Sequence, residues 1–216
     1  MVATMQFQKN AHVLAANDRE VGELERVVVK PATNEVTHIV VRHGSLFKKK
    51  DKVVPIGLVA EATKDQVVLK AETGDPESLP PFEEARIVDE RGRAGRASSN
   101  VPPHVLPGYS GGALFPPDPN DLIVTERVRN IPEGTVAMKE GAKVVAAEGE
   151  RVGQVERVLA EPSEDRITHL LISSGLAAKA RKLIPIRWVD SIDEDLVRLR
   201  VKKVSVDELT NASAAA

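Results

Sequence analysis

Two histidines at matching places are the first residues whose type could carry chemistry. His38 follows Val36 and Thr37, and His169 follows Ile167 and Thr168. Neutral imidazole is a common metal ligand, so one interpretation is a metal site shared by the two histidines. No Asp or Glu lies two or four residues further along in both places to complete a ligand set. We therefore favour two structural strand residues, and we predict neither a metal site nor a cofactor.

Two clusters of basic residues could bind anions. The first cluster is Lys48, Lys49, Lys50 and Lys52, and the second is Lys179, Arg181 and Lys182. Cations gathered on neighbouring loops would form a positive edge for RNA phosphate or for an anionic membrane surface. The alternative is a solvated turn whose charges protect an edge strand from pairing with other chains. Both interpretations remain open, and these seven residues are our candidates for contact with an anion or RNA.

The dipeptide Glu-Arg also occurs twice, as Glu25-Arg26 and Glu156-Arg157. Adjacent side chains on a strand point to opposite faces, so the two members of a dipeptide are not a local acid–base pair. We predict that they form ion pairs across strands or between the two parts of the chain.

Catalytic machinery is not evident. With no cysteine there is no thiol nucleophile, and no Ser-His-acid or paired-carboxylate arrangement emerges. Ser110-Gly111-Gly112 lacks the Lys-Ser/Thr of a phosphate loop, so we interpret it as linker. Trp188, the only tryptophan, adjoins aliphatic residues and is expected to pack rather than bind a ligand. We predict no catalytic residues and no enzyme activity.

The elements that would position these residues occur in two similar segments. Residues 13–44 and 144–175 align without a gap, with identities that include Val21/Val152, Gly22/Gly153 and Thr37/Thr168. Dense β-branched runs predict strands, and the turns PATNE and PSEDR separate them. In those turns Asn34 and Asp165 suit a left-handed position, while Gly22 and Gly153 are interpreted as hairpin punctuation. An internal repeat of this kind determines the architecture.

Domain boundaries follow from the repeat and from composition. We expect a first domain at 9–73, a Pro/Gly-rich linker at 74–121 and a second domain at 122–210, with short strands at 122–124 and 136–138 added to the second domain. The formal net charge of −2 favours neither nucleic acid nor membrane as a global partner. Absent cysteine and the lack of a signal-peptide pattern at the N-terminus favour a cytoplasmic protein.

The order of motifs resembles the PRC-barrel family. The pattern consists of Val-Gly before a strand, Ile/Val-Thr-His in the next strand, then hydrophobic-Pro-hydrophobic and Val-x-Leu, and it occurs twice. The resemblance covers about residues 9–73 and 139–210. It implies an all-β, mostly β protein of two small barrels with few short helices. Such domains occur in the photosynthetic reaction-centre H subunit, in a ribosome maturation factor and in stand-alone prokaryotic proteins, but the companion segments of the first two are missing here.

Together these observations favour a non-enzymatic binding or scaffold protein of a prokaryotic cytoplasm that associates with other proteins. The alternatives are an RNA- or ribosome-associated factor that uses the basic loops, and a peripheral partner of a photosynthetic or electron-transfer membrane complex. A barrel of about 60 residues has a small core. We therefore expect the two barrels to pack on each other or to homodimerise.

Overall fold

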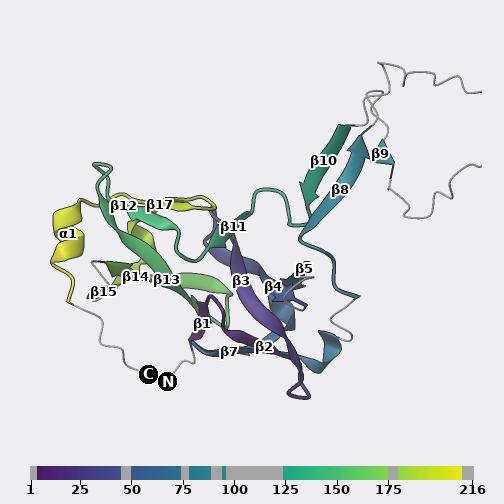
Figure 1. Cartoon of the computed structure of the whole chain (residues 1–216). Helices are drawn as coiled ribbons and strands as arrows, with labels where there is room; N and C mark the ends of the chain where they lie inside the picture. The colour runs from purple at the N-terminus through teal and green to yellow at the C-terminus, as the bar shows by residue number, and fades with distance from the viewer. Residues whose placement is uncertain are drawn as a thin grey trace, which may run out of the picture. The chain divides into compact units, whose positions relative to one another are not determined.

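The computed structural model describes residues 4–44, 50–73, 78–88, 94–95, 124–174 and 180–210. The chain divides into two compact units (Figure 1): Met1–Phe82 with Ile131–Ala216, and Glu83–Asn130. We call the first the main unit and the second the insertion. Within the main unit, the first segment runs to Phe82 and the second segment begins at Ile131.

The two segments have the same succession of elements. The first contains β1 (Met5–Gln8), β2 (His12–Leu14), β3 (Glu20–Lys30), β4 (Glu35–His43), β5 (Lys50–Pro55), the 3₁₀ turn η1 (Ile56–Leu58), β6 (Val59–Ala62), β7 (Gln66–Leu69) and η2 (Ala71–Thr73). The second contains β11 (Val136–Lys139), β12 (Lys143–Val145), β13 (Arg151–Glu161), β14 (Arg166–Ser174), β15 (Ala180–Pro185), η5 (Ile186–Trp188), β16 (Val189–Ile192), β17 (Leu196–Leu199) and the helix α1 (Lys203–Asp207).

The predicted all-β class is confirmed, but the expected pair of closed barrels is wrong. All of these strands belong to one open sheet whose main path is β16-β17-β12-β13-β14-β4-β3-β2-β7-β6. Neither segment closes on itself. In the first segment the backbone leaves β5 through Pro55 and a 3₁₀ turn before β6 begins, and in the second it leaves β15 through Pro185 and a 3₁₀ turn before β16 begins. Proline lacks the N–H that a continuing ladder requires.

The segments exchange their first strands. β1 of the first segment pairs with β13, and β11 of the second segment pairs with β3 (Figure 1). The registers correspond: Phe7 lies opposite Val158, and Met138 lies opposite Val27. Sequence analysis placed residues 136–138 in the second domain, and this is a correction: the strand pairs with the first segment. Each segment therefore completes the sheet of the other.

The two central hairpin turns also join the segments. Val36 N–H donates to the Asp165 carbonyl at 2.7 Å, and Ile167 N–H donates to the Asn34 carbonyl at 2.8 Å. Asn34 and Asp165 have φ values of 58° and 51°, which confirms the left-handed turn positions predicted for them. The turns thus place both hairpins in one sheet.

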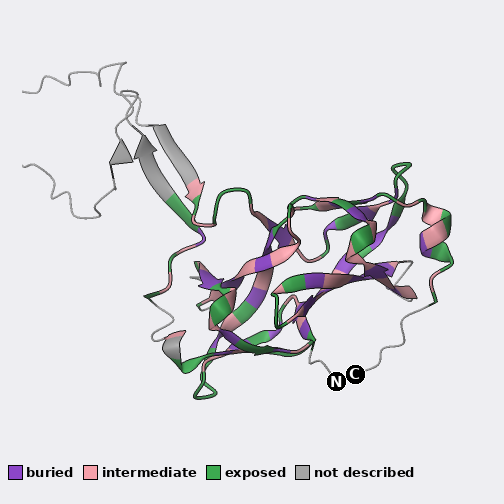
Figure 2. Cartoon of the chain, turned by 180° about the vertical axis from the view of Figure 1, so that it is seen from behind, coloured by how far each residue is buried: buried purple, intermediate pink, exposed green. Residues whose placement is uncertain are grey.

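Side chains alternate between two faces of this sheet (Figure 2). The inner face supplies the main core, in which Val27, Ile39 and Val54 of the first segment meet Val158, Leu170 and Ile184 of the second. Trp188 packs against this core, as expected from its aliphatic neighbours. A smaller cluster lies on the opposite side of the first segment and contains Val28, Val40, Val53, Phe82 and Ala137.

Gly22 and Gly153 are not turn residues. They lie inside β3 and β13, where a Cβ on Gly22 would collide with the Arg42 carbonyl, and one on Gly153 would lie 2.6 Å from the Ser173 carbonyl oxygen. Close approach of a neighbouring strand explains these glycines. The left-handed positions of the preceding turns are Asp18 and Gly149.

The insertion contains a three-stranded antiparallel sheet with the order β10-β8-β9. Its strands are β8 (Glu83–Val88), β9 (Ala94–Gly95) and β10 (Val124–Arg129), and Glu83 pairs with Arg129 at 3.7 Å. Residue 124 was expected in a strand of the second domain but pairs with β8 instead, and residues 122 and 123 lie outside the described ranges. β8 and β9 fall within the expected linker 74–121, because its prolines cluster further along, from 102 to 119. In the part of the chain that the structure describes, no helix has the length and apolar character needed to cross a bilayer.

Candidate interaction site

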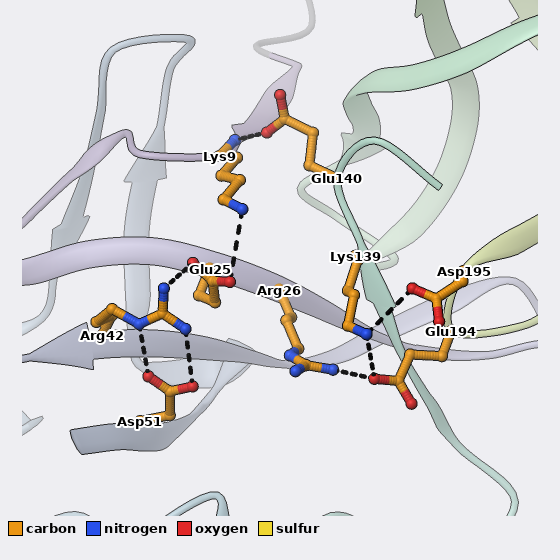
Figure 3. A network of polar contacts seen from close by, with 9 residues as sticks. All are labelled: Lys9, Glu25, Arg26, Arg42, Asp51, Lys139, Glu140, Glu194 and Asp195. Atoms are coloured by element: carbon orange, nitrogen blue, oxygen red, sulfur yellow. Dashed lines mark hydrogen bonds and ion pairs between the residues drawn. The ribbon is translucent and has the colours of Figure 1, made fainter. Parts of the chain in front are cut away.

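Charged side chains cluster where the exchanged strands meet (Figure 3). Arg26 on β3 pairs with Glu194, which lies between β16 and β17 of the second segment. Lys139 on β11 pairs with Glu194 at 3.0 Å and with Asp195 at 3.1 Å. These contacts confirm the predicted ion pair between the two parts of the chain for Arg26. They connect the loop between β16 and β17 to β11 and to β3, the strand with which β11 pairs.

Glu25 forms the cross-strand pair. Arg42 on β4 lies 2.9 Å from the Glu25 carboxylate and makes two further bonds to Asp51 on β5, at 3.0 and 3.2 Å (Figure 3). In the second segment Arg181 pairs with Glu156 at 2.9 Å. The predicted cross-strand ion pairs are therefore confirmed for both glutamates.

Arg157 has a different environment. Its guanidinium donates to Gln8 Oε1 at 2.8 and 3.1 Å and to Gln6 Oε1 at 2.6 Å, so its acceptors are neutral amides of β1. At the corresponding place in the first segment, Arg26 lies over the ring of Phe82 with 5.0 Å between the guanidinium carbon and the ring centroid. That distance is typical of a cation–π contact.

A small apolar hollow lies between the exchanged strands, and Glu140 lies on its rim. Its carboxylate accepts from the Lys9 backbone N–H (Figure 3). Burial raises the pKa of Glu140 to about 7, and the nearby carboxylate of Glu156 adds to the increase, while Lys9 and Arg157 oppose it. This carboxyl is therefore a group that titrates near neutral pH.

The histidines lie on β4 and β14, opposite Pro55 and Pro185. Burial lowers the pKa of both imidazoles, and the charge of Arg187 lowers that of His169 further. His38 Nδ1 is buried and has no hydrogen-bond partner among the described residues. In those same ranges, no three His, Cys, Asp or Glu side chains gather as a metal-binding group.

The basic candidates have different surroundings. Lys48, Lys49 and Lys179 lie outside the described residues, and Lys50 is exposed. Lys52 Nζ donates to the Leu79 carbonyl at 2.7 Å, and Lys182 Nζ donates to the Val206 and Asp207 carbonyls at 2.7 and 2.8 Å. Lys182 is buried, and its ammonium binds the end of α1. Arg181 is paired with Glu156, so three of the four described cations have protein partners. Contact of these residues with RNA or another anion stays a prediction.

The outer faces of the two segments, opposite the main core, differ in burial. On the first outer face, Val28, Val40 and Val53 are at most 1% exposed, because Phe82 and Ile131 pack over them. The corresponding residues of the second segment are Leu159, Leu171 and Leu183. Their neighbours Val158, Leu170 and Ile184 belong to the main core, so alternation directs these three leucines to the outer side. Leu171 is 8% exposed, and Leu159 and Leu183 are more exposed.

The strand edges differ in the same way. On the first segment, residues 80–82 run antiparallel to β5: Val53 N–H donates to the Pro80 carbonyl at 2.9 Å, and Phe82 N–H donates to the Asp51 carbonyl at 2.7 Å. On the second segment, β15 pairs with β14, and no described residue bonds to its other edge. Leu183 N–H corresponds to the Val53 N–H, and the Arg181 carbonyl corresponds to the Asp51 carbonyl. Neither group of the second segment bonds to another strand among the described residues. Sequence reasoning missed this site, although the absence of a Pro-Pro-Phe counterpart after Leu209 signals it.

Comparison with known families supports the PRC-barrel resemblance of the first segment and assigns the second segment to a different family. Residues 9–76 match the model of the PRC-barrel domain, so this part of the chain is one PRC-barrel domain. Residues 138–207 match a different family, described as "Uncharacterized protein conserved in bacteria (DUF2171)". The second PRC-barrel repeat expected from sequence is therefore not shown. No curated protein matches the chain.

Proposed function

We propose that this protein is a non-enzymatic scaffold that binds another protein through the outer face of its second segment. A PRC-barrel domain is compatible with such an interaction role. The second segment has the same strand order and registers as the first, and we propose that it is a PRC-barrel-like repeat that has diverged. The interacting surface is defined by Leu159, Leu171, Leu183 and the free edge of β15.

One observation carries the proposal: the same surface is fully buried in the first segment, whereas in the second it is partly exposed and no described residue bonds to the outer edge of β15. Phe82 and the backbone of residues 80–82 cover the first outer face and its edge. In the second segment, three leucines occupy the positions of three fully buried valines and are partly exposed at two of them. Open apolar surface beside an unpaired edge strand is a usual feature of protein-binding sites.

Site-specific photocrosslinking in cells tests this function. A photoreactive amino acid at position 159 or 183 should give adducts with another protein, because both positions border the open face. The same amino acid at Val204, which is 59% exposed on α1, is the matched control for surface exposure. Adducts should disappear when Leu171→Asp is added, and they should survive nuclease treatment.

Three results would contradict the proposal. Positions 159 and 183 could crosslink no more than position 204, or their adducts could be insensitive to Leu171→Asp. Adducts that nuclease removes would instead favour the RNA-associated alternative. A circular dichroism spectrum of Leu171→Asp that matches the parent protein shows that loss of adducts is not loss of fold.

A further inference from the structure

The first segment shows what kind of ligand such a surface accepts. Its occupant is the extended run Leu79-Pro80-Pro81-Phe82, followed by Glu83 and Glu84. Leu79 packs against the main core, residues 80–82 bond to the edge of β5, and Phe82 fills the outer face. Backbone pairing with an edge strand plus one buried aromatic side chain is the usual arrangement of β-strand addition.

The second segment preserves the groups that hold this occupant. Leu183 N–H and the Arg181 carbonyl correspond to the Val53 N–H and the Asp51 carbonyl that bond to residues 80–82. In antiparallel pairing, every second residue directs its N–H and its carbonyl away from the neighbouring strand. Arg181 and Leu183 are two residues apart, so the Leu183 N–H and the Arg181 carbonyl both point away from β14. A partner strand therefore has the same donor and acceptor available.

The arginine that faces the aromatic ring is also preserved. Arg26 lies over Phe82, and Arg157 occupies the corresponding position beside Leu171 in the register of β13 and β14. Gln6 and Gln8 orient Arg157 without neutralising it. Among the described residues no carboxylate forms an ion pair with Arg157, and a planar guanidinium that is held in place in this way is a suitable surface for an incoming aromatic ring.

Charge distinguishes the two edges. Asp51 and Gly57 of the first segment are replaced by Arg181 and Arg187 in the second. Arg187 is exposed, and among the described residues it has no ion-pair partner. Arg181 is already paired with Glu156, so Arg187 is the cation near this edge that would attract an acidic residue of a partner segment. The occupant of the first segment carries two such residues after Phe82.

We propose that β15 and the outer face of the second segment bind an extended, acidic, aromatic-containing segment of a partner protein by β-strand addition. The segment pairs antiparallel with β15 at Leu183 and Arg181, and its aromatic ring packs on Arg157 and on the exposed parts of Leu159 and Leu183. This inference rests on the proposed function, since it specifies the partner of the same surface.

The probe for the test is a fluorescein-labelled peptide with the sequence of residues 78–84, SLPPFEE, added to the full chain. Fluorescence anisotropy should show saturable binding of one peptide per chain. Replacing Phe by Ala in the peptide should weaken binding about tenfold or more, because the ring supplies most of the buried contact. A scrambled peptide of the same composition is the control for charge.

Variants of the protein locate the binding site. Leu183→Pro removes the outward N–H, whereas Leu183→Ala keeps it, so the proline variant should lose more affinity although both lose the leucine side chain. Arg157→Lys keeps the charge but not the planar group and should weaken binding several-fold. Val204→Asp should leave the affinity unchanged.

Other outcomes overturn the inference. Absence of saturable binding does so, and so does binding that Leu183→Pro and Arg157→Lys leave intact, because the peptide would then compete for the first segment. A dimer that Leu183→Pro dissociates in light scattering would identify a second copy as the occupant. A tenfold gain in affinity on removal of residues 211–216 would identify the chain's own end. If crosslinks at 159 and 183 persist while the peptide fails, the inference is wrong and the proposed function stands.

Discussion

At the scale of single residues, corresponding positions of the two segments have acquired different partners. Arg26 binds a carboxylate and an aromatic ring, whereas Arg157 binds two glutamine oxygens. Lys9 and Glu140 also occupy corresponding positions, and the Lys9 backbone N–H donates a hydrogen bond to the Glu140 carboxylate. Identity of residue type in the sequence therefore does not establish identity of role, since a side chain acts through what it contacts.

Glu140 predicts a pH dependence of stability. Its folded pKa of about 7 lies above the ordinary value of 4.5, so between these values the folded protein binds more protons than the unfolded chain. Its contribution to the free energy of unfolding therefore falls as pH rises through this window. The full shift corresponds to ~3 kcal/mol, which solvent screening at a partly exposed carboxyl reduces to about 1 kcal/mol.

Glu140→Gln keeps the acceptor for Lys9 N–H and removes the titration. We expect the variant to be more stable than the parent by about 1 kcal/mol at pH 8 and equal to it at pH 4.5. Urea denaturation at several pH values measures the difference. A constant difference across this range would show that the carboxyl does not titrate there.

At the scale of elements, close contact between strands explains features that look like turn chemistry in the sequence. Gly153 lies where the Ser173 carbonyl approaches β13, so Gly153→Ala should lower the free energy of unfolding by about 2 kcal/mol or more. Gly57→Ala is the matched control, since a Cβ there meets nothing within 4 Å, and it should change stability by less than about 0.5 kcal/mol. Equal effects in thermal or urea unfolding would contradict the steric explanation.

The buried lysine of β15 is an example of a charge that serves an element rather than a ligand. Lys182 donates hydrogen bonds to two carbonyls at the C-terminal end of α1, where a positive charge also interacts favourably with the helix dipole. Lys182→Met should cost about 1–3 kcal/mol, because the two carbonyls lose their partner. The exposed Lys50→Met is the control and should be nearly neutral; equal losses in urea denaturation would contradict this role.

At the scale of the whole main unit, the exchange of β1 and β11 makes the two segments depend on each other. Separate fragments of residues 1–82 and 131–216 each lack the edge strand that the other supplies. We expect a one-to-one complex when they are mixed, with a gain of β-sheet signal in circular dichroism. If the two fragments were folded on their own and the mixture showed only monomer masses in light scattering, this interdependence would be contradicted.

Much of the fold follows from local patterns along the chain. The β-branched runs, the prolines of β5 and β15 and the turn positions Asn34 and Asp165 predict the strands and their order, because these preferences are properties of neighbouring residues. The cross-strand role of the Glu-Arg dipeptides follows from alternation. The exchange of first strands does not follow, because pairing with either β3 or β13 satisfies the same short apolar pattern.

The candidate site shows the same division. Residue types and their spacing alone determine the two similar segments, the all-β class and the PRC-barrel resemblance at 9–73, which the family match at 9–76 supports. They also single out the basic and histidine candidates. Only the tertiary structure decided that the sheet stays open and that Lys52 and Lys182 bind backbone carbonyls. It also decided that Phe82 covers the outer face of the first segment, whereas Leu159 and Leu183 of the second segment stay partly exposed. The physical reason is that local preferences select strands and turns, whereas burial and backbone pairing depend on which distant strands meet.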